Sequence, residues 1–226
     1  MKINSISDIG STRQENQDNF WSALLKVDDE ETGVVCMCDG MGGLDNGALA
    51  SKIVVEAVRT SILDGTALYN LRDLLLNANK TIYNLSNAGN RMGTTCTVLC
   101  CRKGEYYIHH IGDSRCYLIS NNTITLLTKD HSVINEYGIT KENNEELYRK
   151  YKSKLTRCIG VKEDTTIDVY KGNYTDGDIF LLCSDGFWHY FEDSGYNLNL
   201  GDLKASINQC MKYGETDNIS VSVLYT

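Results

Sequence analysis

The sequence of 226 residues contains no proline and no long apolar run. No turn can therefore be fixed by a pyrrolidine ring, and slow prolyl isomerisation is excluded from folding. No apolar stretch approaches the roughly 18 residues that a membrane-spanning helix needs, so we expect no membrane partner. Residues 1–5 lead into polar sequence rather than into an apolar segment with a small-residue cleavage site, which argues against a secretory signal. We expect a cytoplasmic protein.

Cysteine pairs at metal-binding spacing are absent as well. The chain has nine cysteines but no Cys-x-x-Cys pair, and several of them, such as Cys36, Cys38, Cys96 and Cys183, lie inside apolar runs. An odd number cannot pair completely, and in a reducing compartment such thiols behave as small hydrophobic side chains. The cysteine pattern therefore disfavours a zinc site.

Positive charge is scarce. Lys and Arg number 22 against 30 Asp and Glu, which gives a formal net charge of −8. Affinity for nucleic acid depends on clustered basic residues that release counterions, so we expect no nucleic-acid partner. Hydrophobic residues make up 42% of the chain, and a chain of this length can bury one large core. We expect a single domain that spans residues 1–226.

Apolar periodicity predicts strands grouped around two long helices. Strands are expected near residues 3–9, 20–27, 34–38, 94–101, 105–111, 115–119, 123–127, 165–170, 179–183 and 219–225, and helices near 53–62, 71–85 and 203–211. Because the strands do not alternate singly with helices, the pattern favours an α+β fold over a doubly wound parallel sheet. Two packed, mostly antiparallel sheets flanked by helices, a four-layer α-β-β-α sandwich, fit this order. Residues 128–154, rich in Asn, Glu, Lys and Tyr, are predicted to form a mobile insert.

Five aspartates stand where a predicted strand begins or ends: Asp18, Asp39, Asp113, Asp185 and Asp217. Carboxylates at the rim of a buried sheet lose hydration and repel one another, so they stay ionised together only where cations compensate them. Oxygen ligands suit hard ions such as Mg²⁺ or Mn²⁺. One such aspartate alone is most often a turn or cap residue, but five together predict a metal site.

Glycines adjoin three of these aspartates. The run Asp39-Gly40-Met41-Gly42-Gly43 places three glycines close behind one carboxylate, and Gly112-Asp113 and Asp185-Gly186 are similar. Glycine permits positive φ and lets a backbone carbonyl approach an ion closely. The glycines therefore strengthen the prediction of a metal site.

An ordered set of strings covers nearly the whole chain. The strings are Gly10-Ser11-Thr12-Arg13 through Asn16-Gln17-Asp18, Asp39-Gly40-Met41-Gly42-Gly43, Gly93-Thr94-Thr95, Gly112-Asp113-Ser114-Arg115, Leu127-Thr128-Lys129-Asp130-His131-Ser132, Leu155-Thr156-Arg157, Ser184-Asp185-Gly186 and Asp217-Asn218-Ile219. In this order they resemble successive motifs of the PPM family of metal-dependent Ser/Thr protein phosphatases, also called protein phosphatase type 2C, and especially its compact bacterial members.

The resemblance implies a phosphatase that hydrolyses phosphoserine and phosphothreonine in proteins by direct attack of a metal-activated water, with no phosphoenzyme. Its cofactors would be two or three Mn²⁺ or Mg²⁺ ions. Asp39 would bridge two ions, with the Gly40 carbonyl, Asp185 and Asp217 as the other protein ligands. Asp18 would act mainly through water.

The resemblance also implies a third, weaker ion held by Asp113 together with Asp185. Arg13 would bind the substrate phosphate, a role that its planar, permanently charged fork suits on physical grounds. Alternatively, Arg13 forms a salt bridge at the protein surface and has no role in binding. Residues 132–154 align with the family's flap, which lies near the active site and influences substrate choice.

One departure from the family concerns the acid that protonates the leaving group. Many members carry a histidine within or just after the glycine-rich motif, whereas this chain has Met41 and Leu44 there. Metal-bound water or another residue would then supply the proton. His131 is a candidate, although a histidine beside a predicted helix start is more often structural.

Two other patterns point to different chemistry and are disfavoured. Cys96 and Arg102 have the C-x5-R spacing of cysteine-dependent phosphatases, but the residues between them form a β-type run rather than a glycine-rich phosphate loop. His109 and His110 are adjacent on a predicted strand, so their side chains point to opposite faces and cannot easily share an ion.

The leading hypothesis is therefore a protein serine/threonine phosphatase that reverses a cytoplasmic kinase, acts on phosphorylated proteins including that kinase or its targets, and works as a monomer. The alternative is a catalytically weak or inactive regulatory or binding module with the same fold, suggested by the missing histidine. A two-metal nuclease is a third possibility, which the acidic charge disfavours.

Overall fold

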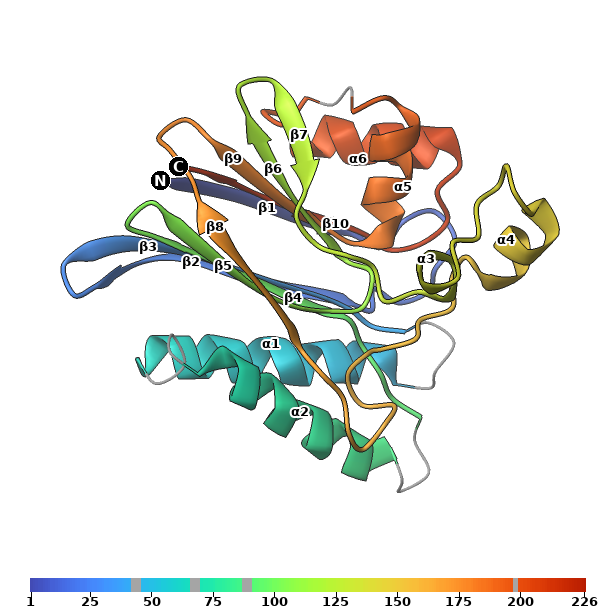
Figure 1. Cartoon of the computed structure of the whole chain (residues 1–226), viewed down its shortest axis with the longest axis horizontal. Helices are drawn as coiled ribbons and strands as arrows, with labels where there is room; N and C mark the ends of the chain where they lie inside the picture. The colour runs from blue at the N-terminus through green and yellow to red at the C-terminus, as the bar shows by residue number, and fades with distance from the viewer. Residues whose placement is uncertain (42–45, 66–69, 87–90, 197–198) are drawn as a thin grey trace.

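Two five-stranded sheets lie face to face in the computed structural model, and helices cover their outer faces (Figure 1). The structure describes residues 1–41, 46–65, 70–86, 91–196 and 199–226. Gly42, Gly43 and Leu44 of the glycine-rich run lie outside the described residues.

Both sheets are antiparallel throughout. The first has the order β1 (Lys2–Asp8), β10 (Ile219–Tyr225), β9 (Ile179–Cys183), β6 (Arg115–Ser120) and β7 (Thr123–Leu126). The second has the order β2 (Asp18–Val27), β3 (Glu30–Asp39), β4 (Cys96–Arg102), β5 (Glu105–Ile111) and β8 (Asp168–Asn173). The predicted α+β class with two antiparallel sheets is confirmed.

Helices form the two outer layers of the sandwich. The second sheet is covered by α1 (Gly47–Leu63) and α2 (Leu71–Ser86), and the first by α5 (Asp185–Asp193) and α6 (Leu203–Tyr213) (Figure 1). The short helices α3 (Val133–Glu136) and α4 (Glu145–Tyr151) stand at one end of the molecule. The four predicted layers are therefore present in the predicted order.

Strand β3 shows why the central strands are continuously apolar. Its residues from Val34 to Cys38 are fully buried. Val34, Cys36 and Cys38 belong to the core under α1 and α2, whereas Val35 and Met37 belong to the core between the two sheets. A strand covered on both faces needs apolar side chains at every position.

The predicted strand at residues 165–170 begins later than expected, at Asp168. Thr166 Oγ1 accepts a hydrogen bond of 2.7 Å from Arg157 Nη1, and the pairing with β5 starts at Asp168 opposite His110. A side-chain contact from outside the sheet therefore replaces strand pairing at Thr166.

The chain direction gathers one set of loops at a single end of the sandwich. Both termini lie at the other end, and β1, β3, β5 and β9 all run away from the termini (Figure 1). The turns that follow these four strands, and those that precede β2 and β10, therefore lie together beside α3 and α4.

The segment 128–154 has a buried part and an exposed part. Thr128, His131 and Ser132 are buried, and Val133 N donates a hydrogen bond to Lys154 O, which closes the segment at its base. Helices α3 and α4 have no buried residues. The mobility of the segment stays a prediction. Within the described residues, no helix is both long and apolar enough to cross a membrane.

Candidate active site

The antiparallel topology brings the five predicted aspartates to one end. Asp18 begins β2 and pairs with Asp39, which ends β3. Asp113 lies in the turn between β5 and β6, Asp185 is the first residue of α5, and Asp217 precedes β10. Four of them, Asp39, Asp113, Asp185 and Asp217, line one cleft of about 480 Å³. Asp18 is buried and accepts a hydrogen bond of 2.9 Å from Ser184 Oγ, the residue before Asp185.

The carboxyl groups share a strongly unfavourable electrostatic environment. Burial raises the pKa of Asp39 well above its usual range, and the charges of Asp18, Asp185, Asp113 and Asp217 raise it further. Burial likewise raises the pKa of Asp113 to about 8 and that of Asp18 to about 7. Without compensating cations, several of these groups hold protons at neutral pH.

The donor set fits hard divalent ions. Asp18 Oδ1 and Asp185 Oδ1 are buried, and neither has a hydrogen-bond partner in the described part of the chain. A buried carboxylate oxygen without a partner is costly unless a cation binds it. The oxygens are also spread out, since no three of the five carboxylates come within 4.8 Å of one another. An arrangement of this width suits more than one ion.

Gly40 follows Asp39 at a point where three segments meet. A Cβ at this position would lie 2.4 Å from Gly47 O at the start of α1 and 2.6 Å from Gln17 O before β2. Gly40 N donates to Gln17 O at 3.1 Å. Gly40 is not among the residues with positive φ. Close backbone packing is the reason for glycine here.

Arg13 reaches the cleft from the loop between β1 and β2. Its Nη2 donates to Asp217 Oδ2 at 2.6 Å, and both side chains are partly exposed. The loop is anchored to the residues on either side of Asp217, because Thr12 Oγ1 donates to Thr216 O and Asn218 Nδ2 donates to Ile9 O and Glu15 O in the loop. Sequence positions about 200 residues apart thus form one rigid corner of the site.

His131 forms hydrogen bonds that hold the turn containing Asp113 in place. Its Nδ1 accepts a hydrogen bond of 3.0 Å from Gly112 N, and its Nε2 lies 3.1 Å from Asp168 Oδ2. Arg157 donates both Nη atoms to the same Asp168 carboxylate. An acceptor Nδ1 assigns the ring proton to Nε2, which then donates to Asp168. His131 is buried and both its nitrogens are engaged, so the structure favours a positioning role over the leaving-group acid.

The sequence analysis did not predict some residues of the site. Arg91 and Lys154 line the same cleft as the aspartates and add positive charge to it. His189 stands one helical turn after Asp185 on α5, and its charge lowers the pKa of both Asp185 and Asp113, although burial raises them more. The spacing of four residues on one helix was the available signal for His189.

The two disfavoured patterns do not converge on the site. Cys96 and Arg102 stand at opposite ends of β4, where Arg102 donates to Asp28 Oδ2 at 2.8 Å. His110 is fully buried and its Nδ1 lies 2.9 Å from Thr97 Oγ1, whereas His109 is partly exposed beside a different cavity. The histidine side chains do point to opposite faces of the sheet.

Comparison with known proteins agrees with this geometry. The sequence profile described as protein phosphatase 2C matches residues 11–221. The chain belongs to this family. The serine/threonine phosphatase stp of Listeria welshimeri is 30% identical over 234 residues, which cover 95% of this chain and 92% of that protein.

Solved structures of the family have the same fold. The serine/threonine phosphatase of S. agalactiae superposes with a TM-score of 0.84 at 27% identity, over 100% of this chain and 99% of that one. The catalytic domain of the serine/threonine protein phosphatase PstP, solved in complex with two manganese ions, has a TM-score of 0.78 at 24% identity, over 98% of this chain and 96% of that one.

Proposed function

We propose that this member of the protein phosphatase 2C family is a metal-dependent protein serine/threonine phosphatase whose active site is the aspartate-lined cleft. The observation that carries the proposal is the convergence of five buried or half-buried aspartates at one end of the sandwich. Two of them have buried oxygens without a hydrogen-bond partner among the described residues. The names of the relatives and the manganese ions of PstP support the same reaction.

The chain would hold two or three Mn²⁺ or Mg²⁺ ions. The ligands we propose are Asp39, Asp185, Asp217 and the Gly40 carbonyl for two ions, Asp18 through water, and Asp113 with Asp185 for a third. When bound, the ions supply a water acidic enough to attack phosphorus and positive charge beside the phosphoryl oxygens.

Arg13 would bind the phosphate of the substrate. The ion pair between Arg13 and Asp217 competes with phosphate binding by Arg13 and with metal binding by Asp217. The same carboxylate oxygen cannot bind a metal ion and accept a strong hydrogen bond from Arg13 at once. A cation on Asp217 would weaken the pair and free the guanidinium fork to donate to phosphoryl oxygens. Arg91 and Lys154, on the wall of the cleft, would attract the anionic substrate.

The test uses para-nitrophenyl phosphate and a phosphothreonine peptide with purified protein and Mn²⁺. We expect hydrolysis of both, loss of activity with EDTA, and loss in Asp39→Asn. The matched control is Asp164→Asn, because Asp164 is exposed and is not among the residues that line the cleft. Activity that survives both EDTA and Asp39→Asn would contradict the proposal.

We further propose that the protein is a cytoplasmic monomer that reverses a serine/threonine kinase and acts on that kinase or its targets. Support comes from the relatives named as serine/threonine phosphatases, since such enzymes need a phosphorylated protein to act on. Phosphoproteomics of cells that carry Asp39→Asn should show phosphoserine and phosphothreonine sites that accumulate. Light scattering should give a mass near 25.3 kDa.

A further inference from the structure

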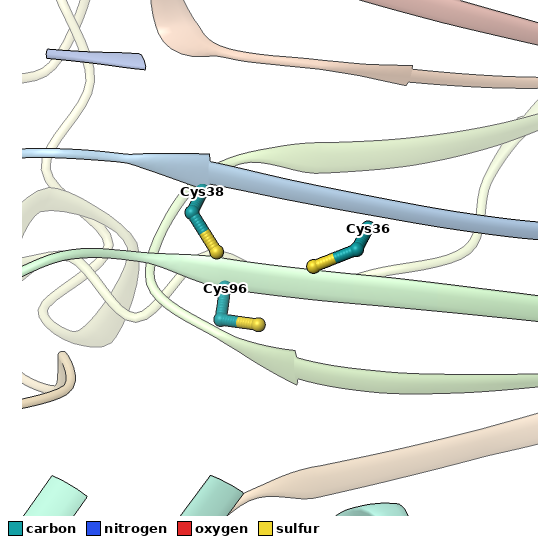
Figure 2. A group of neighbouring side chains, drawn as sticks. All are labelled: Cys36, Cys38 and Cys96. Atoms are coloured by element: carbon teal, nitrogen blue, oxygen red, sulfur yellow. The ribbon is translucent and has the colours of Figure 1, made fainter. Parts of the chain in front are cut away.

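Three cysteines from two neighbouring strands converge inside the core. Cys36 and Cys38 alternate along β3 and therefore point to the same face of the sheet. Cys96 begins β4, and the register that pairs Cys36 with Val98 continues to bring Cys38 opposite Cys96. Figure 2 shows the three sulfurs turned toward one another, and all three lie within 4.8 Å of one another. We call these residues the thiol triad.

The thiol triad is fully buried and includes no carboxylate. All three cysteines are fully buried, in the core between the second sheet and helices α1 and α2. Within the described residues, no fourth His, Cys, Asp or Glu atom joins the group. Among the described His, Cys, Asp and Glu side chains, the site therefore offers three sulfurs and no carboxylate or imidazole ligand.

We propose that Cys36, Cys38 and Cys96 form a binding site for a soft monovalent ion, Cu(I), coordinated by three sulfurs. A metal–sulfur bond of about 2.3 Å places three ligands of a trigonal site about 4 Å apart, so the triad needs to contract by less than about 1 Å. Thiolate sulfur selects Cu(I) among the soft ions, whereas structural Zn²⁺ takes four ligands.

The charge of the triad also suits a monovalent ion. A Cu(I) ion that displaces one thiol proton of the triad leaves no net charge in the apolar core, where an unpaired charge is costly.

The triad lies directly behind the proposed active site. Cys38 precedes Asp39 and Cys96 follows Thr95, and Asp39 N donates to Thr95 Oγ1 while Thr95 N donates to Asp39 O. Contraction of the triad would shift this pair, so we expect Cu(I) to lower phosphatase activity. Because the triad is sealed, loading requires local opening of α1 and should be slow.

The test measures Cu(I) retained by the full-length, reduced, Mn²⁺-loaded protein in competition with the chromophoric chelator bathocuproine disulfonate under anaerobic conditions. We expect one Cu(I) per chain in the wild type and loss of that ion in Cys36→Ala, Cys38→Ala and Cys96→Ala. The matched control is Cys100→Ala, because Cys100 lies on the same strand and in the same core but outside the triad. The control should retain the ion.

Two further measurements keep the outcome clear. X-ray absorption of the loaded wild type should show three sulfur neighbours, which decides the matter even if a triad variant fails to fold. Asp39→Asn should still retain Cu(I), so that failure of the proposed phosphatase activity and failure of the copper site can be told apart. The proposal is overturned if no Cu(I) is retained, if the triad variants retain it as well as Cys100→Ala does, or if fewer than three sulfurs coordinate it.

Discussion

The raised pKa values of the buried carboxyl groups predict how the stability of the metal-free protein depends on pH. With EDTA present, the folded protein should lose stability as the pH rises from 6.5 to 8. Saturating Mn²⁺ should remove this loss, because bound cations let the same carboxyls ionise without repulsion.

The size of the effect follows from two groups. The pKa of Asp113 is raised to about 8 and that of Asp18 to about 7, from 3.8 in the unfolded chain. Burial is the largest cause in both, and the charges of neighbouring carboxylates add to it. The folded state therefore binds more protons than the unfolded state, and the resulting stability is complete below pH 3.8 and lost as the pH rises through 7 and 8. At about 1.4 kcal/mol per pKa unit, the loss between pH 6.5 and 8 is on the order of 2 kcal/mol.

The chosen window avoids most of the titration of the buried His109 and His110, whereas His189, whose pKa is raised despite its burial by the hydrogen bond with Glu215, also loses stability as the pH rises through this window. Burial lowers the pKa of His109 to about 4 and that of His110 to about 3, from 6.5. Such groups add stability as the pH rises through 6.5, and about 0.4 kcal/mol per histidine is still gained above pH 6.5, where the unfolded histidine is half protonated. Below pH 6.5 His109 and His110 oppose the carboxyl effect strongly, and above pH 6.5 they offset only part of it.

The assay is thermal unfolding across this pH range, with EDTA and then with Mn²⁺. A loss of about 2 kcal/mol corresponds to a melting temperature lower by roughly 4–8 °C for a chain of this size. Asp113→Asn should reduce the drop by more than half, whereas the exposed control Asp164→Asn should leave it unchanged. A melting temperature that stays flat or rises between pH 6.5 and 8 with EDTA would refute the reasoning.

Three further changes test single parts of the site. Gly40→Ala places a Cβ 2.4 Å from Gly47 O and should cost about 1–3 kcal/mol of unfolding free energy, measured by urea denaturation; a neutral result would contradict the packing argument. Arg13→Ala removes hydrogen bonds to a charged phosphate and should lower kcat/KM by about 10–100-fold, with Mn²⁺ binding retained. An unchanged kcat/KM would show that Arg13 forms only a surface salt bridge. His131→Gln should destabilise the fold by about 1–3 kcal/mol but leave the pH profile of kcat unchanged; loss of one limb of that profile would make His131 a proton donor after all.

The aspartates could be predicted because each occupies a local sequence context. A carboxylate beside an apolar run, such as Asp39 after Met37 and Cys38, indicates the rim of a buried strand without any knowledge of the partners. The same context placed Asp185 at a strand end, where Ser184 alone separates it from β9 and where it begins α5. Antiparallel pairing then brings such rims together, and the ordered motifs of the family made the fold predictable as well.

Contacts between distant segments could not be predicted in this way. The hydrogen bonds of His131 to Gly112 and Asp168 depend on how three strands and a loop pack, and the sequence around His131 left its role open. The convergence of Cys96 with the cysteines of β3 depends on strand register, so a search for local cysteine pairs missed it. Register becomes visible only when the sheet is assembled.

The most direct test of the metal site is a calorimetric titration with Mn²⁺, followed by phosphate release from a phosphothreonine peptide on the same samples. Our account predicts two or three Mn²⁺ per wild-type chain, activity that rises as these sites fill, and loss of both in a folded Asp39→Asn protein. Wild-type protein that hydrolyses the peptide without binding Mn²⁺, or Asp39→Asn protein that binds Mn²⁺ as the wild type does, would contradict it.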